Sequence, residues 1–305
     1  HRIRLHLSDG RTFDCDDRHY LLARGNPFPW WVKAVDAGNV PLALDTNTHW
    51  GQALDDVDDW YWLGRFIGAG CVNKNIWAMS FGHTEQEIAD VHRFESWLKS
   101  KGFQGRTKEY HGRETLGYSI TQDRRGNHQV SGGTSRGRDF WVRKGMSYRQ
   151  GAKGKRIPSI VFTLDRTRRQ AVFDGYFDAD GHQRTNKNAK KVSSVSHTLL
   201  EDLLRLMQTL GMRGRVGRPS FSTYNNQRFS WFELFIYHTP QDFERLRYTE
   251  SVEKLGEDEM YTLSVDAPEH SFSTEGLISK NSGGEVMRWA IVKFGEYLET
   301  HPKIR

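Results

Sequence analysis

The sequence predicts an all-β domain that is interrupted by an α/β domain and then resumed. Three observations lead to this fold class. Residues 1–44 alternate apolar and polar side chains over short stretches, as strands do. Residues 57–238 carry the same order of elements twice, and such a repeat indicates two halves packed about a pseudo-twofold axis. Residues 249–281 return to short strands with polar turns. We therefore expect the two ends of the chain to form one domain around an insertion.

The first strands are marked by alternation and by a turn. Ile3, Leu5 and Leu7 occupy every second position, and Asp9-Gly10 follows them as a hairpin signal. Near the other end, residues 260–282 read as two further short strands.

Each half of the insertion contains an amphipathic helix. Residues 84–102 place Ile88, Val91, Phe94 and Leu98 at helical spacing, with Thr84 as the cap and Gly102 as the stop. Residues 196–211 repeat this design and stop at Gly211. A strand-like segment, FSWFELFIYH, closes the second half.

Bulk composition excludes several classes of protein. The 305 residues carry a net charge of +6, and no apolar run approaches the roughly 20 residues that cross a bilayer. The mean hydropathy of −0.72 is typical of a water-soluble protein. Cys15 and Cys71 are too few for a disulfide framework or a zinc cluster. We expect the chain to be a monomer. We also expect it in the cytoplasm, because a reducing compartment suits a chain with so few cysteines.

Basic residues concentrate between Arg124 and Lys191. They alternate there with glycine, serine, asparagine and aromatic residues, a pattern that suits hairpins following a phosphate backbone. A solvated basic face is the alternative. The balance favours double-stranded DNA as the partner.

Two glycine-containing helical segments open the two halves. Residues 62–70 read WLGRFIGAG and residues 173–181 read FDGYFDADG. Their alignment sets Gly64 on Gly175, Gly68 on Ala179 and Ala69 on Asp180. Small residues four apart form a flat stripe that lets two helices approach backbone to backbone. The residue before the final glycine then lies at the carboxyl end of its helix, beside its counterpart.

These segments resemble the motifs of the LAGLIDADG homing endonucleases, whose domain has a pseudo-twofold αββαββα design. The resemblance implies that Asp180 is a metal-binding catalytic acid for Mg²⁺, and that β-ribbons lie in the major groove of DNA. Residues 154–162, GKRIPSIVF, resemble the family's basic block, which implies that Lys155 assists cleavage electrostatically. In this sequence Ala69 replaces the second acid, so we expect DNA binding to persist while cleavage is weak or absent.

The flanking β segments resemble the splicing blocks of inteins, the Hint domain. Residues 260–282 end in Lys280, Asn281 and Ser282. The resemblance implies that the Asn281 amide cyclises and cuts the bond to Ser282, that Ser282 is the acceptor nucleophile, and that His270 donates a proton. Lys280 stands where the family usually has histidine.

The N-terminal part resembles the intein block that carries a Thr-x-x-His signature. His19 takes the histidine position, and Asp16 replaces the threonine. The family's opening nucleophile would precede His1, so we expect a missing N-terminal block. Residues 282–305 are then host protein, in one interpretation a P-loop ATPase.

The predicted domains are 1–50 and 248–281 for the Hint domain, 51–247 for the endonuclease, and 282–305 for the host segment. A free-standing LAGLIDADG protein that binds DNA without splicing is the alternative. A third hypothesis, a hedgehog-type autoprocessing domain, requires neither the inserted repeat nor the terminal asparagine.

Overall fold

The computed structural model describes residues 1–23, 30–43, 51–72, 76–105, 117–133, 135–146, 151–183, 190–224, 227–237, 249–257, 271–274 and 277–280. The chain divides into two compact units. Unit 1 consists of His1–Asn47, Gly211–Val216 and Tyr237–Arg305, and unit 2 consists of Thr48–Leu210 and Gly217–Ile236. No helix among the described residues is long and apolar enough to cross a membrane.

Unit 1 is built from strands that come from both ends of the chain. These strands are β1 (Arg2–Leu7), β2 (Thr12–Asp16), β3 (Tyr20–Ala23), β4 (Trp30–Lys33), β12 (Arg213–Val216), β15 (Thr249–Gly256), β16 (Ser271–Thr274) and β17 (Leu277–Lys280). One sheet has the order β15-β1-β2 and another the order β16-β17-β3-β4. Ile3, Leu5 and Leu277 are buried in one core, so the first and last described strands share it. A short 3₁₀ helix, Ala34–Asp36, follows β4.

The turn at Asp9-Gly10 forms as predicted. Gly10 has a φ of +86°, and its N–H donates to the carbonyl of Leu7. The N–H of Val216 donates to the carbonyl of Asp9 at 2.8 Å, and Gly10 lies against Val216. This contact accounts for the inclusion of residues 211–216 in unit 1, whereas the sequence places them inside the insertion, 51–247.

The first half of unit 2 follows the predicted αββαββα order with one additional short strand, β7. It contains α1 (Val57–Ala69), β5 (Gly70–Val72), β6 (Trp77–Phe81), α2 (Glu85–Ser100), β7 (Gln104–Gly105), β8 (Gly117–Gln122), β9 (His128–Gly132) and α3 (Ser135–Arg143). Its strands form a sheet in the order β5-β6-β9-β8-β7. Two 3₁₀ helices, Ala152–Gly154 and Ser159–Thr163, lead to the second half.

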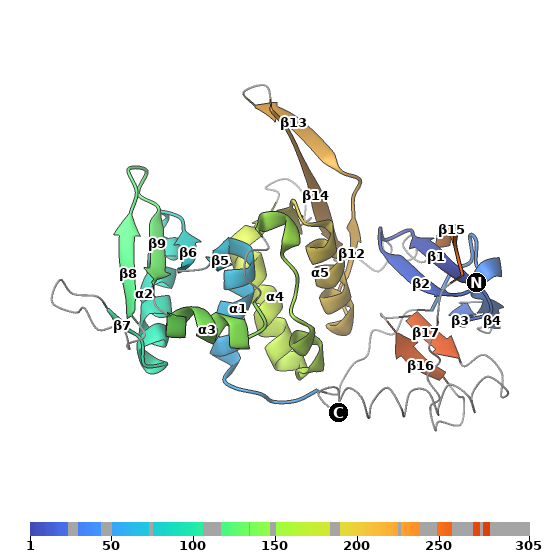
Figure 1. Cartoon of the computed structure of the whole chain (residues 1–305), viewed down its shortest axis with the longest axis horizontal. Coiled ribbons are helices and arrows are strands. Elements are labelled where there is room, and N and C mark those ends of the chain that lie inside the picture. The colour runs from blue at the N-terminus through green and yellow to red at the C-terminus, as the bar shows by residue number, and fades with distance from the viewer. Residues whose placement is uncertain are drawn as a thin grey trace. The chain divides into compact units, whose positions relative to one another are not determined.

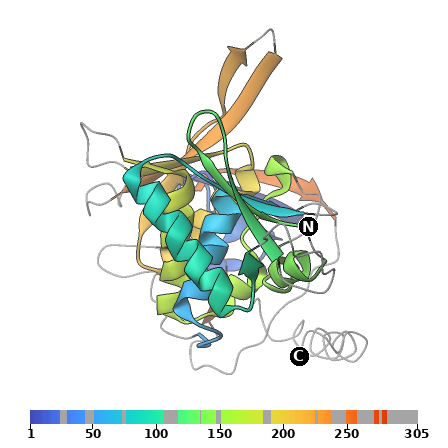
Figure 2. The same ribbon diagram turned by 90° about the vertical axis from the view of Figure 1, so that its left-hand side faces the viewer.

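The second half repeats the first six elements of the αββαββα order among its described residues. It contains α4 (Arg166–Asp180), β10 (Gly181–Gln183), β11 (Lys190–Ser194), α5 (His197–Thr209), β13 (Ser220–Tyr224) and β14 (Gln227–Tyr237). β10, β11 and β14 are neighbours in one sheet, and β13 pairs with β14. Helices α1 and α4 lie side by side at the centre of the unit (Figure 1). The β13–β14 hairpin extends beyond the helices in both views (Figures 1 and 2).

Helices α2 and α5 form where the sequence predicts them. Thr84 accepts a hydrogen bond from the N–H of Glu87, and Ser196 caps α5 in the same way through Leu199. Gly102 and Gly211 follow the two helices with positive φ. One detail differs from the expected pattern, because Ile88 is 37% exposed rather than part of the core.

The basic stretch 124–191 is not a run of hairpins throughout, which corrects the sequence-based expectation. Residues 135–143 form helix α3, and its Trp141 is fully buried. The indole stacks on Phe66 of α1, with 3.9 Å between the ring centroids. Burial of this large ring against α1 stabilises a helix that its glycine, serine and aspartate disfavour.

Candidate functional site

Helices α1 and α4 touch backbone to backbone, and two glycines make this possible. A Cβ atom on Gly64 would lie 2.0 Å from the carbonyl oxygen of Val172. A Cβ atom on Gly175 would lie 1.9 Å from the carbonyl oxygen of Tyr61. Gly64 precedes Gly175 by the same interval that separates Tyr61 from Val172. The predicted small-residue stripe and the alignment of the two segments are therefore visible as a pseudo-twofold contact.

Each central helix ends at a glycine from which a strand begins at once. The N–H of Gly70 donates to the carbonyl of Phe66, and that of Gly181 donates to the carbonyl of Phe177. A Cβ atom at either glycine would lie within 2.4 Å of that same carbonyl oxygen. The residues just before these glycines, Ala69 and Asp180, consequently occupy equivalent helix ends.

The structure brings Lys155 and Asp180 together at these helix ends. The Lys155 ammonium donates to the carbonyl oxygen of Gly68 in α1. A Cβ atom on Gly68 would lie 3.4 Å from Oδ2 of Asp180, so the carboxylate borders the same helix end. Ser196 Oγ donates to the carbonyl of Lys155 at 2.8 Å and ties this segment to the cap of α5.

Burial and the neighbouring charge shift the pKa values of Lys155 and Asp180 in opposite directions. Burial lowers the pKa of Lys155, and the neighbouring Asp180 carboxylate acts in the opposite direction. Burial likewise raises the pKa of Asp180, against the effect of the Lys155 charge. The catalytic role of Lys155 and the catalytic and metal-binding roles of Asp180 stay predictions.

The donor set at this site does not fit a divalent metal. Mg²⁺ requires near-octahedral oxygen coordination. Ala69 contributes no side-chain oxygen, and the Lys155 ammonium already occupies the carbonyl of Gly68. In the described part of the chain no three His, Cys, Asp or Glu side chains lie together as a metal site. Asp180 is thus the one acid that the two motif ends provide.

Two polar contacts beside the helix pair are not apparent from the sequence. Tyr61 donates its hydroxyl hydrogen to Oδ2 of Asp178 at 2.9 Å, and burial raises the pKa of Tyr61 to about 12. Arg65, 1% exposed, pairs with Glu87 and with Asp90 of α2, the latter at 3.1 Å. Asp178 therefore links α1 to α4, while Arg65 fixes α2 on α1. The sequence signal is that Arg65 interrupts the otherwise apolar stretch 60–70.

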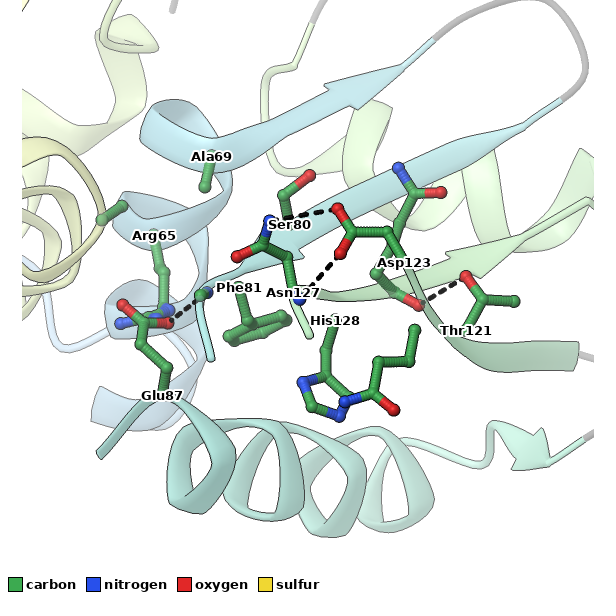
Figure 3. Close-up of a pocket in the computed structure, with 13 residues that line it drawn as sticks. Arg65, Ala69, Ser80, Phe81, Glu87, Thr121, Asp123, Asn127 and His128 are labelled. Carbon is green, nitrogen blue, oxygen red and sulfur yellow. Dashed lines mark hydrogen bonds and ion pairs between the residues drawn. The ribbon is translucent and has the colours of Figure 1, made fainter. Parts of the chain in front are cut away.

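A pocket of about 520 Å³ opens beside Ala69 in the first half (Figure 3). Its wall includes Ser80 of β6, Gln129 of β9 and Thr121 of β8. The register pairs Ser80 with Gln129 and Gln129 with Thr121, so the three side chains form one row across three strands. Hydroxyl and amide groups both donate and accept hydrogen bonds. We call Ser80, Gln129 and Thr121 the polar row; it suits base edges in a DNA groove.

Asp123 and Asn127 close the other side of this pocket. Asp123 accepts hydrogen bonds from the N–H groups of Arg125 and Asn127 at 2.8 and 2.9 Å. The side-chain hydrogen bond from Asn127 is the largest cause that lowers the pKa of Asp123. These bonds fix the turn between β8 and β9, so the role of Asp123 at the pocket edge is explained by the structure of this turn.

The predicted splicing residues lie in unit 1 or outside the described residues. His19 precedes β3, its side chain is 16% exposed, and its Nδ1 lies 3.9 Å from a carboxylate oxygen of Asp16. Burial lowers the pKa of His19, and the charge of Asp16 opposes this. Lys280 ends β17 and pairs in the ladder with Tyr20. His270, Asn281 and Ser282 lie outside the described residues, as does the predicted host segment 282–305.

Comparisons with known proteins give one match to a family model. Residues 168–254 match the model of the LAGLIDADG-like domain. Among curated proteins, a probable translation initiation factor IF-2 of Thermococcus kodakarensis is 37% identical over 75 residues, 25% of this chain and 7% of that protein. A DNA polymerase of Thermococcus sp. (strain GE8) is 36% identical over 61 residues, 20% of this chain and 4% of that protein. The matched segment thus spans less than a tenth of either protein.

Solved structures give weaker matches. The homing endonuclease I-DmoI in complex with DNA and Ca is 13% identical, with a TM-score of 0.39 over 62% of this chain and 86% of that chain. The same protein in complex with DNA and Mn is 14% identical, with a TM-score of 0.38 over 64% of this chain and 98% of that chain. The N-terminal LAGLIDADG domain of DUF199/WhiA is 11% identical, with a TM-score of 0.35 over 67% and 86% of the two chains.

Proposed function

We propose that unit 2 is a DNA-binding domain of the LAGLIDADG type that recognises a duplex but cleaves it poorly. One observation carries this proposal. The paired ends of α1 and α4 bear Ala69 and Asp180, with the Lys155 ammonium between them. The close packing of the two helices retains the scaffold for DNA binding. The helix pair offers only one acid, however, and lacks the second acid that the family's metal chemistry uses.

The polar row supports DNA as the partner. Ser80, Gln129 and Thr121 lie on one side of the sheet of the first half, and the chain is basic overall with a net charge of +6. Cationic groups supply affinity for phosphates, while hydroxyl and amide groups discriminate between bases. Both requirements are met without a metal.

Selection of duplexes from a random-sequence library by the full chain, in buffer containing EDTA, tests this proposal. We expect enrichment of one sequence and an affinity that falls steeply as salt rises from 50 to 200 mM, about a thousandfold if six phosphates are contacted. Variant Gln129→Ala should relax the preference at one position of the selected site. If the chain enriches no sequence and binds no duplex at low salt, the proposal is wrong.

Autoproteolysis of the intein type is a second candidate function, and it concerns unit 1. Its support is the ladder between β3 and β17, in which Lys280 pairs with Tyr20 and thus lies one residue from His19. A cleavage centre at Asn281 would then have the largely buried imidazole of His19 nearby. In this reaction the Asn281 amide nitrogen attacks its own carbonyl carbon, the bond to Ser282 breaks, and the amine of Ser282 leaves with a proton.

Intact mass after incubation near neutral pH tests this second candidate. We expect loss of residues 282–305 and a succinimide or Asn at position 281, and we expect Asn281→Ala to abolish the loss. A mass that stays unchanged over days contradicts cleavage by this chain and leaves the DNA-binding proposal intact.

A further inference from the structure

The β14 strand presents two different faces. Leu234 and Ile236 are buried, and Phe232 contacts His197 of α5 with 4.7 Å between the ring centroids. Even-numbered residues of β14 therefore face the helix. Because side chains alternate along a strand, the odd-numbered residues Phe229 and Trp231 lie on the face away from α5.

The rings on this outer face are poorly covered. Phe229 is 47% exposed, and Trp231 is partly exposed. Their partners across the ladder are Ser222 and Ser220, whose small side chains leave the rings open. We call Phe229 and Trp231 the aromatic pair. Phe221 is also exposed, at 53%, but its ring lies 4.1 Å from the Arg228 guanidinium, on the other face of the hairpin.

Two basic residues accompany the aromatic pair. Arg218, which is exposed, lies two residues before β13, and Lys191 pairs with Phe235 and so lies on the outer face of β14. The carboxylate of Glu233 on β14 is paired with the Lys191 ammonium. An apolar patch on a chain of net charge +6 is complementary to a polyanion with apolar groups, which is the character of the major groove where thymine methyl groups project.

The two halves therefore offer different chemistry to a duplex. The polar row of the first half carries hydroxyl and amide groups, whereas the outer face of β14 carries the aromatic pair. We propose, on the basis of the DNA-binding function above, that the aromatic pair contacts the C5-methyl groups of thymines. The recognised duplex is then asymmetric: the half bound by β13–β14 is rich in thymine, and the half bound by the polar row is read by hydrogen bonds.

Replacement of thymine by uracil tests this inference, since it removes the methyl group and keeps every hydrogen-bonding group. The probes are the duplex selected by the full chain and two copies in which deoxyuridine replaces thymidine in one half-site or the other. We expect about a fourfold loss of affinity for each contacted methyl, the factor that ~0.8 kcal/mol of burial gives. The loss should occur in one half-site only.

Matched variants assign the effect to the aromatic pair. Phe229→Ala and Trp231→Ala should bind thymine and uracil duplexes equally, while Phe229→Leu should keep part of the preference. Phe221→Ala, which removes an equally exposed ring from the opposite face, should behave like the wild type. Equal melting temperatures of all four variants would show that the fold is retained.

The experiments distinguish failure of the thymine inference from failure of the DNA-binding proposal. Binding of the selected duplex with no uracil effect, or a uracil effect that survives in Phe229→Ala and Trp231→Ala, overturns the thymine inference alone. Absence of binding to any duplex overturns both proposals.

Discussion

Lys155 donates a hydrogen bond from its ammonium to the carbonyl oxygen of Gly68, and this bond fixes a cation beside Asp180 at the point where α1 ends. Position 69 carries a methyl group there, although the equivalent position of α4 carries a carboxylate. The site therefore holds one cation and one acid whose charges oppose each other.

Restoring the second acid should restore cleavage. In Ala69→Asp, two carboxylates would stand at equivalent helix ends, and we expect Mg²⁺-dependent scission of the selected duplex at a rate about 100-fold or more above the wild type. Nicking and linearisation of a plasmid bearing the selected site measure this. Ala69→Asn, with a similar volume and no charge, is the control; equal cleavage by both variants would argue against an electrostatic origin.

The contact between the central helices should not tolerate a methyl group. In Gly175→Ala the new Cβ would meet the Tyr61 carbonyl at 1.9 Å, and backbone cannot rotate away as a side chain can. We expect the free energy of unfolding to fall by about 3 kcal/mol or more. Urea denaturation measures it. Gly38→Ala, where a Cβ atom meets nothing within 4 Å, should have little effect.

The buried Arg65 should be more important for stability than its exposed counterparts. Arg65→Met leaves the carboxylates of Glu87 and Asp90 without their buried cation. We expect a loss of about 3 kcal/mol or more, because an unpaired charge near the interior is costly. Lys99→Ala removes a 60% exposed partner of Glu95 on the same α2 helix and should cost only about 0.5 kcal/mol. Similar losses in both variants would contradict the burial argument.

Acid should destabilise unit 1 through Asp14. Hydrogen bonds from Arg4, and secondarily from Arg2, lower the pKa of Asp14 to about 2 from 3.8. A depressed pKa adds stability above the unfolded value that is lost as pH falls towards 2. We expect Asp14→Asn to cost ~1 kcal/mol at pH 7, after allowance for solvent screening, and nothing near pH 2. Thermal melts of the wild type and of Asp14→Asn between pH 7 and pH 2 measure this effect. A stability difference between the two proteins that does not change with pH would contradict the prediction.

Sequence reasoning succeeds where local chemistry decides the structure. Thr84, Gly102 and Gly211 act as cap and stops because capping and positive φ depend on a few neighbouring atoms. The alignment of Gly64 with Gly175 was predictable for a similar reason, since only glycine permits the backbone contact.

Sequence reasoning fails where distant residues decide. Helix α3 is stabilised by the stacking of Trp141 on Phe66, a tertiary contact that no local propensity encodes. The pairing of Arg65 with Glu87 and Asp90 likewise depends on how α2 packs on α1. The aromatic pair became visible only when the register of β13 with β14 was known.

The central claim is that this chain reads DNA without needing a metal and cuts it poorly. The most direct test follows binding and strand scission in the same sample of wild-type chain and selected duplex, first with EDTA and then with Mg²⁺. We predict the same affinity in both conditions and intact DNA after prolonged incubation. Efficient Mg²⁺-dependent double-strand cleavage by the wild type would contradict the claim, because Asp180 and Lys155 would then suffice for the chemistry.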